Sequence, residues 1–295
     1  MKKNSIPKIG VIGKGFVGAA TANGFSAGTG FNSEIRIFDK DGSKGTHTLE
    51  DLIDHSEIVF ICVPTPAHID GSIDVSIIES VFNEINDIKS DNKLSIVFVI
   101  KSTIVPGTSR KIQEKYNKMK IVFNPEFLTE RSSNFDFINQ ARIVLGGEES
   151  NTKKIRNLYE DRFGLSTLII ETNFETAELI KYACNNYFSL KISFLNELKL
   201  LANKVNVDWE VLINGFVSDG RIGHSHLNVP GHDGLLGFGG ACFPKDIQAM
   251  IKFAQSHGIE MRTLEAAWET NLNVRPEKDW EKLLGRAVSH KSDGG

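Results

Sequence analysis

Short runs of apolar, often β-branched residues recur through the first 170 residues of this 295-residue chain. Consecutive apolar positions are typical of strands that are buried on both faces of a sheet. Stretches long enough to form helices separate most of the runs, and right-handed crossovers then place the strands in one parallel sheet. The chain therefore predicts an α/β fold with a Rossmann-type doubly wound sheet over residues 1–171. The runs are 8–13, 35–38, 58–63, 96–100, 121–123, 143–145 and 168–170.

The pattern changes after residue 171. Thr172-Asn173-Phe174-Glu175 fits a capping box at a helix start, and no Gly or Pro follows until about Lys204. Apolar residues between these points recur with helical spacing, which predicts one helix of about 30 residues and roughly 45 Å. A helix of this length is too long for one small domain to cover. We therefore expect a helical domain over residues 172–275, in which the long helix joins domains or lies on a dimer axis.

The segments beyond this helix differ from one another. Residues 208–240 are rich in Gly and His and are predicted to form a loop, whereas residues 245–272 have helical spacing again. Residues 276–295 are polar and end in Ser-Asp-Gly-Gly, so we expect a C-terminal tail that frays. The chain thus divides into three expected parts, 1–171, 172–275 and 276–295.

Charge and composition exclude several classes of protein. With 34 Lys and Arg against 37 Asp and Glu, the net charge of −3 offers no attraction to nucleic acid or anionic lipid. No apolar run approaches the ~18 residues that span a bilayer, and Lys8 and Lys14 interrupt any secretory signal. Three cysteines without metal-ligand spacing predict neither disulfides nor a bound metal, so we expect a soluble, reduced, cytoplasmic protein. His224, His226 and His232 are expected to be solvated loop residues.

A glycine-rich turn follows the first apolar run and opens a stretch of small residues that reads as a helix. Glycines at such a turn let the backbone approach a pyrophosphate, and the helix N-terminus supplies N–H groups. Asp39, 21 residues after Gly18 and at the end of the second run, is placed to accept a hydrogen bond from a ribose 2′-hydroxyl. Its charge favours NAD over NADP, although Lys40 weakens this preference; a turn without a ligand is the alternative. The expected cofactor residues here are Gly13, Gly15, Phe16, Val17, Gly18, Asp39 and Lys40.

Cys242 differs in its surroundings from the other two cysteines. Cys62 and Cys184 lie in apolar segments, as structural cysteines do, whereas Cys242 follows a Gly-rich loop and has Lys245 nearby. A nearby cation favours the thiolate, which is the reactive form of cysteine. On these grounds alone a nucleophile and an inert loop cysteine are equally supported.

Other polar residues are placed where a site could form. Glu126 and Glu130 follow one apolar run and Thr103 follows another, at the carboxyl edge where open α/β sheets bind ligands. Lys181 and Asn185 are four residues apart on the long helix and share a face. From periodicity alone, a solvated surface pair is the favoured interpretation of these last two residues.

Together these motifs resemble the UDP-glucose/GDP-mannose dehydrogenase family. The resemblance implies an enzyme that oxidises the C6 alcohol of a nucleotide sugar to a carboxylate in two NAD-dependent steps. UDP-glucose 6-dehydrogenases have a similar Phe-Pro-Lys-Asp after the cysteine, which favours UDP-glucose as the substrate and UDP-glucuronate as the product. The matching strings, in family order, are 13–18, 63–66, 101–108, 124–130, 177–197, 221–223 and 237–246.

The resemblance also implies roles for individual residues. Cys242 corresponds to a nucleophile that forms a thiohemiacetal and then a thioester with the half-oxidised sugar. Lys181 and Asn185 match the pair that stabilises the oxyanion, and Glu126 matches a carboxylate that acts as acid or base in thioester hydrolysis. The same resemblance assigns Thr103 and Asp246 to a catalytic water, and it assigns Arg221 to the substrate of the neighbouring subunit in a homodimer. Further cofactor contacts implied are Thr65, Pro66, Ser102, Thr103, Glu130 and Lys245, and implied substrate contacts are Phe127, Leu128, Glu130, Lys181, Asn185, Arg221, Phe238, Gly239 and Lys245.

The chain also departs from the family pattern. It ends about where a third, nucleotide-gripping domain would begin, and the loop 223–237 is longer than expected. His226 stands where an aromatic residue is frequent in the family. These departures leave GDP-mannose or another nucleotide sugar as alternative substrates, and a relative that binds NAD without turnover as an alternative function.

Overall fold

The computed structural model describes residues 6–88 and 91–289. The chain divides into two compact units. The first comprises Met1–Thr65 and Val75–Lys181, and the second comprises Pro66–Asp74 and Tyr182–Gly295. The expected boundary at residue 171 lies earlier in the chain than this division. Across the described parts of both units, no helix is long and apolar enough to cross a membrane.

A seven-stranded sheet organises the first unit, in the order β2-β1-β3-β4-β5-β6-β7. Each predicted apolar run forms a strand, with ends within two residues of the prediction. The first five strands are parallel neighbours, which confirms the doubly wound sheet. The strands are β1 (Lys8–Ile12), β2 (Glu34–Phe38), β3 (Ile58–Ile61), β4 (Val97–Ile100), β5 (Lys120–Phe123), β6 (Ile143–Gly147) and β7 (Ile169–Thr172).

One strand pair departs from the expected parallel arrangement. β5 and β6 pair antiparallel, whereas β6 and β7 are parallel. The helix between β5 and β6, α5 (Ser133–Ile138), has six residues and rises only about 9 Å. It is too short to return the chain across the sheet, so β6 starts from the edge at which β5 ends. The helix after β6, α6 (Glu149–Phe163), has 15 residues and makes the crossover that a parallel pair needs.

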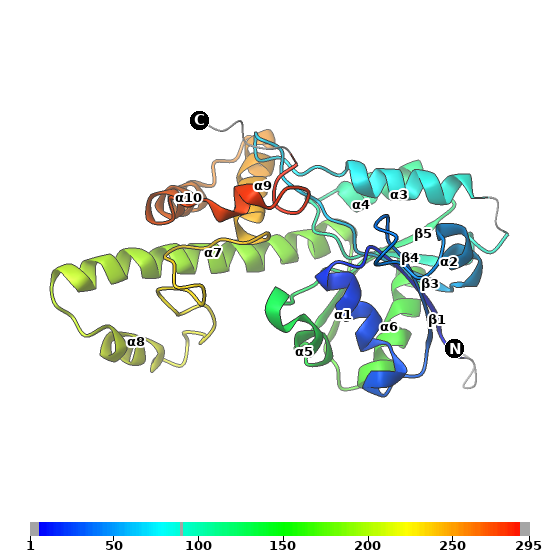
Figure 1. Ribbon diagram of the computed structural model, residues 1–295, viewed down its shortest axis with the longest axis horizontal. Helices are drawn as coiled ribbons and strands as arrows, with labels where there is room; N and C mark the ends of the chain where they lie inside the picture. Colours follow the sequence, from blue (N-terminus) through cyan, green and yellow to red (C-terminus); the bar gives the residue numbers. More distant parts are fainter. Residues whose placement is uncertain (1–5, 89–90, 290–295) are drawn as a thin grey trace. The chain divides into compact units, whose positions relative to one another are not determined.

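Helices cover both faces of the sheet and enclose two apolar cores. One core contains Phe25, Phe60 and Tyr159, with residues of α1, α5 and α6; the other contains Phe82 and Phe98, with residues of α2, α3 and α4. Figure 1 shows α1, α5 and α6 on one side of the strands, with α3 and α4 on the other. The bounds are α1 (Phe16–Gly24), α2 (Leu49–His55), α3 (Ser76–Asp87) and α4 (Thr108–Lys115), with short 3-10 turns η1 (Ala27–Thr29) and η2 (Glu130–Ser132).

The predicted long helix is α7 (Phe174–Lys204), with 31 residues. The predicted capping box is wrong in its details, because Thr172 belongs to β7 and pairs with Gly146. Asn173 takes the capping role instead, and its side-chain oxygen accepts a hydrogen bond from the N–H of Thr176 at 2.8 Å. Phe174, the first residue of the helix, is buried against the sheet.

The second unit is helical, as predicted, but differs from the prediction in its elements. Within the predicted loop, Trp209–Val217 forms α8, which Asp208 caps through the N–H of Val211. The segment 245–272 contains two helices, α9 (Phe243–Ser256) and α10 (Arg262–Val274), separated at Gly258 with φ +72°.

The predicted fraying of the tail is wrong for residues 276–289, and residues 290–295 lie outside the described part. Asp279–Lys282 forms a 3-10 turn, η3, and the ring of Trp280 lies 5.3 Å from that of Trp268. Trp280 is buried, so the tail contributes to the core of the second unit.

Candidate active site

The glycine-rich turn has the geometry of a ligand cradle. Gly13 has φ +88°, and its N–H donates to the carbonyl of Phe38 at 2.9 Å. A Cβ on Gly18 would lie 1.9 Å from the Gly13 carbonyl oxygen, so α1 packs against the turn only without a side chain there. A Cβ on Gly15 would meet nothing within 4 Å. The space beside Gly15, at the N-terminus of α1, therefore fits a pyrophosphate.

Asp39 lies beside this turn and is fixed by two backbone donors. Its Oδ2 accepts from the N–H of Lys14 at 2.6 Å, and its Oδ1 accepts from the N–H of Asp41 at 2.9 Å. Each carboxylate oxygen has a second acceptor site, so both remain able to accept from ribose hydroxyls. Lys40 forms an ion pair with Glu84 at 3.2 Å, which reduces its attraction for a 2′-phosphate. An open pocket lined by Asp39, Lys40 and Thr46 adjoins these groups.

Hydroxyl groups tie together the segments that follow β3 and β4. Thr65 Oγ1 donates to the carbonyl of Thr103 at 2.7 Å, and Ser102 Oγ donates to the carbonyl of Val63 at 2.6 Å. Thr65 and Ser102 are buried, whereas Thr103 is half-buried. The next expected cofactor residue, Pro66, is the first residue of the second unit.

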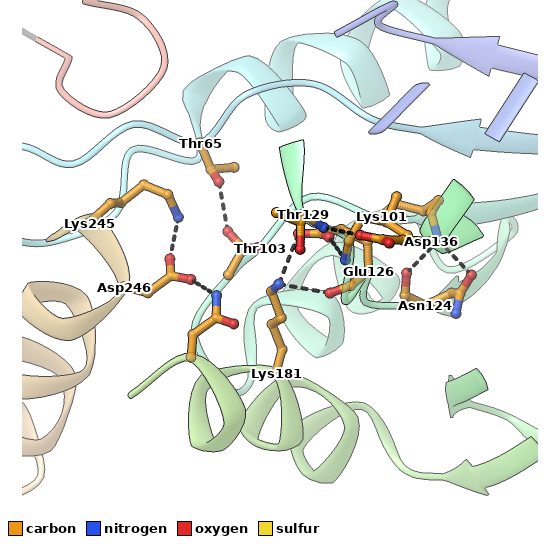
Figure 2. A network of polar contacts seen from close by, with 12 residues as sticks. Thr65, Lys101, Thr103, Asn124, Glu126, Thr129, Asp136, Lys181, Lys245 and Asp246 are labelled. Atoms are coloured by element: carbon orange, nitrogen blue, oxygen red, sulfur yellow. Dashed lines mark hydrogen bonds and ion pairs between the residues drawn. The ribbon is translucent and has the colours of Figure 1, made fainter. Parts of the chain in front are cut away.

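A buried ion pair joins the end of β5 to α7. Lys181 Nζ donates to Glu126 Oε1 at 2.8 Å and to the Glu126 carbonyl at 2.7 Å (Figure 2). Glu126 Oε2 accepts from the N–H of Leu128 at 2.6 Å. Lys181 and Asn185 are both buried, so the interpretation of a solvated surface pair is wrong. The Lys181 ammonium also lies 5.6 Å from the centre of the Phe127 ring.

A second buried cation, Lys101, which was not predicted from the sequence, lies next to this pair. Lys101 Nζ donates to Asn124 Oδ1 at 2.9 Å (Figure 2). The same oxygen accepts from Tyr159 OH at 2.6 Å. Burial lowers the pKa of Lys101 to about 8, against the opposing charge of Glu126. Its position directly after a wholly apolar strand was the available signal. Burial also raises the pKa of Cys62 to about 12, as fits a structural cysteine.

Phe127 and Leu128 line a pocket that Lys101 and Glu126 also line. The guanidinium of Arg142 lies 4.1 Å from the centre of the Phe127 ring. Glu130 is exposed and begins the turn η2. The first unit thus has most of its predicted site residues after the carboxyl ends of β1 to β5, and Lys181 reaches Glu126 from α7.

The second unit holds a separate polar cluster around the start of α9. Asp246 is buried; its Oδ2 accepts from Asn185 Nδ2 at 2.6 Å, and its Oδ1 contacts Lys245 Nζ at 2.5 Å. The N–H of Asp246 donates to the carbonyl of Cys242 at 2.9 Å. Cys242 is half-buried and directly precedes α9. The cluster therefore fixes the first turn of α9 next to the predicted nucleophile.

The remaining predicted residues of the second unit differ in exposure. Arg221 has an 89% exposed side chain and pairs with Asp219. Phe238 is buried, and its backbone N–H and carbonyl both bond to Asn271. Gly239 packs against Arg275 and Asp279. His224, His226 and His232 are exposed, as expected. The ring of His226 also stacks on that of Phe188, with 4.0 Å between the ring centres.

Relatives of the chain share both units. Among curated proteins, MJ1054 of Methanocaldococcus jannaschii is 37% identical over 79% of this chain and 25% of its own length. The UDP-glucose 6-dehydrogenase TuaD of Bacillus subtilis is 33% identical over 78% of this chain and 49% of its own length. The UDP-glucose 6-dehydrogenase of Rickettsia felis is 33% identical over 81% of this chain and 53% of its own length. The chain thus spans about half the length of these dehydrogenases.

Solved structures have a similar fold. A UDP-glucose dehydrogenase from Pyrobaculum islandicum matches with a TM-score of 0.79 and 28% identity, over 96% of this chain and 72% of its own. A ternary complex of GDP-mannose dehydrogenase from Pseudomonas aeruginosa matches with a TM-score of 0.66 and 26% identity, over 94% and 70%.

Family domains match most of the chain. Residues 36–162 match the NAD binding domain of the UDP-glucose/GDP-mannose dehydrogenase family, and residues 175–273 match its central domain. The NAD binding domain, the glycine cradle and the fixed Asp39 agree that the cofactor is NAD. Because the matched regions cover well over half of its residues, the chain belongs to the UDP-glucose/GDP-mannose dehydrogenase family.

Proposed function

We propose that this protein oxidises the C6 alcohol of a nucleotide sugar to a carboxylate, with UDP-glucose as the substrate and UDP-glucuronate as the product. The observation that carries this proposal is the buried Asn185–Asp246–Lys245 cluster, which fixes the helix turn that follows Cys242. A loop cysteine without a chemical role needs no such arrangement of buried charges, because burying charged groups costs free energy.

NAD, when bound, accepts a hydride in each of two oxidations. The Gly13–Gly18 turn and Asp39 bind and orient this cofactor, and Thr65, Ser102 and Thr103 shape the adjoining strand ends. Pro66, Glu130 and Lys245 are proposed as further cofactor contacts. These residues contribute position rather than chemistry to the reaction.

Cys242 supplies the covalent step of the proposed mechanism. Its sulfur adds to the C6 aldehyde formed by the first oxidation and gives a thiohemiacetal. Loss of a hydride from C6 converts this adduct to a thioester, and water then cleaves the C–S bond, releasing the carboxylate and the thiol. An unhydrated aldehyde is a poor hydride donor, which is why the thiol adduct is needed.

The buried polar groups serve the charges that develop in this sequence. The Lys181 ammonium and the Asn185 amide are proposed to stabilise the oxyanion on the sugar, since both are N–H donors in low-dielectric surroundings. Glu126 is proposed to transfer protons during thioester hydrolysis, and Thr103 and Asp246 to position the water. Phe127, Leu128, Phe238 and Gly239 are proposed to line the substrate site.

Purified protein with NAD and a panel of nucleotide sugars tests this proposal. We expect NADH with UDP-glucose at two NADH for each sugar consumed. Cys242→Ser is expected to abolish the four-electron reaction, because a hydroxyl does not replace the thiolate as nucleophile. Absence of NADH with every sugar in the panel, or normal four-electron turnover by Cys242→Ser, would contradict the proposal.

Two other functions have support. The likeness to GDP-mannose dehydrogenase favours GDP-mannose as the alternative substrate, which the same panel would identify. The other alternative is a protein that binds NAD without turnover, because the NAD binding domain is matched whereas the role of Cys242 is proposed. NAD binding by calorimetry, with no turnover on any sugar, would be the result expected of that protein.

We further propose that the protein is a homodimer formed through α7. Tyr187, Phe194 and Leu201 recur every seven residues on this helix and are 62%, 51% and 58% exposed. A second copy would cover this apolar stripe, and Arg221 is proposed to reach the substrate of that copy. A monomer in light scattering at micromolar concentration would contradict this proposal. The cytoplasmic location stays a prediction from the cysteine content.

A further inference from the structure

The backbone of the loop 236–240, which leads to Cys242, is held by side chains from elsewhere in the second unit. Asn196 Oδ1 of α7 accepts from the N–H of Gly237 at 3.0 Å. Asn271 of α10 accepts from the N–H of Phe238 at 2.7 Å and donates to its carbonyl at 3.0 Å. Asp279 Oδ2 accepts from the N–H of Gly240 at 3.0 Å. Side chains therefore hold the N–H groups of Gly237, Phe238 and Gly240, three of the five residues of the loop.

The glycines of this loop are required by those same side chains. A Cβ on Gly239 would lie 2.4 Å from Arg275 Nη2 and 2.5 Å from both carboxylate oxygens of Asp279. A Cβ on Gly237 would lie 2.4 Å from Asn271 Oδ1. The loop thus packs its backbone directly onto the buried side chains of Arg275 and Asn271 and the half-buried side chain of Asp279, which only glycine permits.

Arg275 is the centre of this arrangement. It is 3% exposed, and its Nε donates to Asp279 Oδ1 at 2.6 Å while Nη2 donates to Asp233 Oδ2 at 2.6 Å. Its Nη1 donates to the carbonyl of Leu236 at 3.2 Å. One guanidinium therefore joins three segments: the loop 223–237, the loop 236–240, which we call the glycine loop, and η3. Although burial opposes ionisation, hydrogen bonds from Arg275 lower the pKa of both carboxyls.

The network connects the segment before Cys242 to residues near the C-terminal end of the described chain. Asp279 bonds to Gly240, which is two residues before Cys242. Arg275 and Asp279 lie beyond residue 273, where the match to the family's central domain ends. Asp279 belongs to the polar segment 276–295, for which the sequence predicts no role.

We propose that Arg275 and Asp279 are positioning residues that hold the glycine loop in the conformation that presents Cys242 to the substrate. The effect on catalysis rests on the proposed function. The effect on the loop does not, because it is measurable without any substrate.

Hydrogen exchange followed by mass spectrometry tests the loop directly. Arg275→Met removes the guanidinium, and Asp279→Asn leaves one acceptor oxygen for the two donors that Asp279 now serves. Both variants are expected to exchange at least about tenfold faster in peptides covering residues 237–242, because a lost buried hydrogen bond opens the backbone locally. Arg262→Met is the matched control, since Arg262 begins the helix that Arg275 caps and, with an 85% exposed side chain, pairs with Glu260. It is expected to leave exchange unchanged.

The stoichiometry of turnover separates positioning from a general loss of structure. The first oxidation needs no thiol, whereas the second does, so a displaced Cys242 lowers the ratio of NADH to sugar from two towards one. A hydrazide reagent would trap the released aldehyde. A merely structural role would lower both oxidations together and leave the ratio at two. Asp279→Asn keeps the Arg275–Asp233 pair and is the variant to use if Arg275→Met does not fold.

The outcomes are distinct. Faster exchange confined to residues 237–242, with a lowered ratio, supports the proposal. Unchanged exchange in Asp279→Asn, or faster exchange with the ratio still at two, overturns it. If the wild-type protein turns over no sugar, the proposed function fails, and the exchange data then decide only whether Arg275 and Asp279 hold the loop.

Discussion

The two units hold their candidate site residues by different means. In the first unit, site residues follow the ends of adjacent strands, and short side chains such as Thr65 and Ser102 bond to the backbone of the next segment. In the second unit, the loop before Cys242 depends on side chains that are 33 to 41 residues away in the chain. A sheet therefore positions the first group of residues, and individual long-range hydrogen bonds position the second.

This difference determines how each region responds to substitution. Backbone pairing in a sheet survives the loss of most single side chains, because its hydrogen bonds are between main-chain groups. A loop held by side chains loses a specific bond with each substitution. The exceptions in the first unit are its buried charges, and they provide the sharpest tests of the comparison.

Lys181→Met is expected to have the largest effect. It leaves the buried carboxylate of Glu126 without its cation, which costs about 3–5 kcal/mol of the free energy of unfolding. Turnover should be lost as well. Denaturant titration measures the stability, with Lys44→Met as control, because the Lys44–Asp41 pair is exposed. The double variant Lys181→Met/Glu126→Gln should regain part of the loss; no recovery would show that the buried charge was not the cause.

Gly18→Ala and Gly15→Ala form a matched pair, and their effects on stability and on NAD binding are expected to be the next largest. A Cβ on Gly18 meets the Gly13 carbonyl at 1.9 Å, so this variant is expected to lose about 1–3 kcal/mol of stability through overpacking. A Cβ on Gly15 meets only open space, so Gly15→Ala should unfold like the wild type but bind NAD at least about tenfold more weakly. Calorimetric titration with NAD measures the second effect. Equal stability of the two variants would refute the close packing of α1 on the turn.

Tyr159→Phe tests a single buried hydrogen bond. It removes the 2.6 Å bond to Asn124 and is expected to cost about 1 kcal/mol. Because Lys101 donates to the same oxygen, Tyr159→Phe and Lys101→Met should be non-additive in a double-mutant cycle. Additive losses would mean that the three groups do not act as one network.

The strands of the first unit were predictable from the sequence, because each run of β-branched residues is local and continuous. The direction of β6 was not, since it depends on the length of α5, which no pattern revealed. The helix α8 was not predicted, because the many Gly and His residues nearby favoured a loop. The sequence did offer two signals for a helix start: Asp208, which caps the helix, and the large apolar residue Trp209, which is buried.

The site residues divide in the same way. Gly13–Gly18, Asp39 and Glu126 follow strand ends and were predictable from their place in the pattern. Cys242 was undecided until the family resemblance was considered, because reactivity depends on its neighbours in space. Arg275 and Asn271 gave no signal, since a buried polar residue near the end of a helix looks like a surface residue in sequence.

In the first unit, Glu178 holds a distant backbone segment with its side chain, as Asn271 and Asp279 do in the second unit. This buried carboxylate on α7 accepts from the N–H of Gly107 at 2.7 Å and from that of Ser109 at 2.8 Å, where α4 begins. Burial raises the pKa of Glu178 from 4.5 to about 7, against the opposing effect of these hydrogen bonds. The folded state therefore keeps a proton that the unfolded chain releases between pH 4.5 and 7. Stability from this group is then highest below pH 4.5 and declines as the pH rises to about 7.

Glu178→Gln should remove this decline, and the amide, which has one acceptor oxygen for two donors, should cost about 1 kcal/mol near pH 5. The variant is thus expected to be less stable than the wild type at pH 5 and to approach it, or exceed it, at pH 8. Thermal unfolding across this range measures the difference. Glu175→Gln is the control, because Arg110 lowers the pKa of Glu175 and places its titration below pH 4.5. The difference in stability between wild type and Glu178→Gln could instead be constant from pH 5 to 8. That result would mean that Glu178 is ionised throughout this range, and that its hydrogen bonds from backbone N–H groups outweigh the effect of burial.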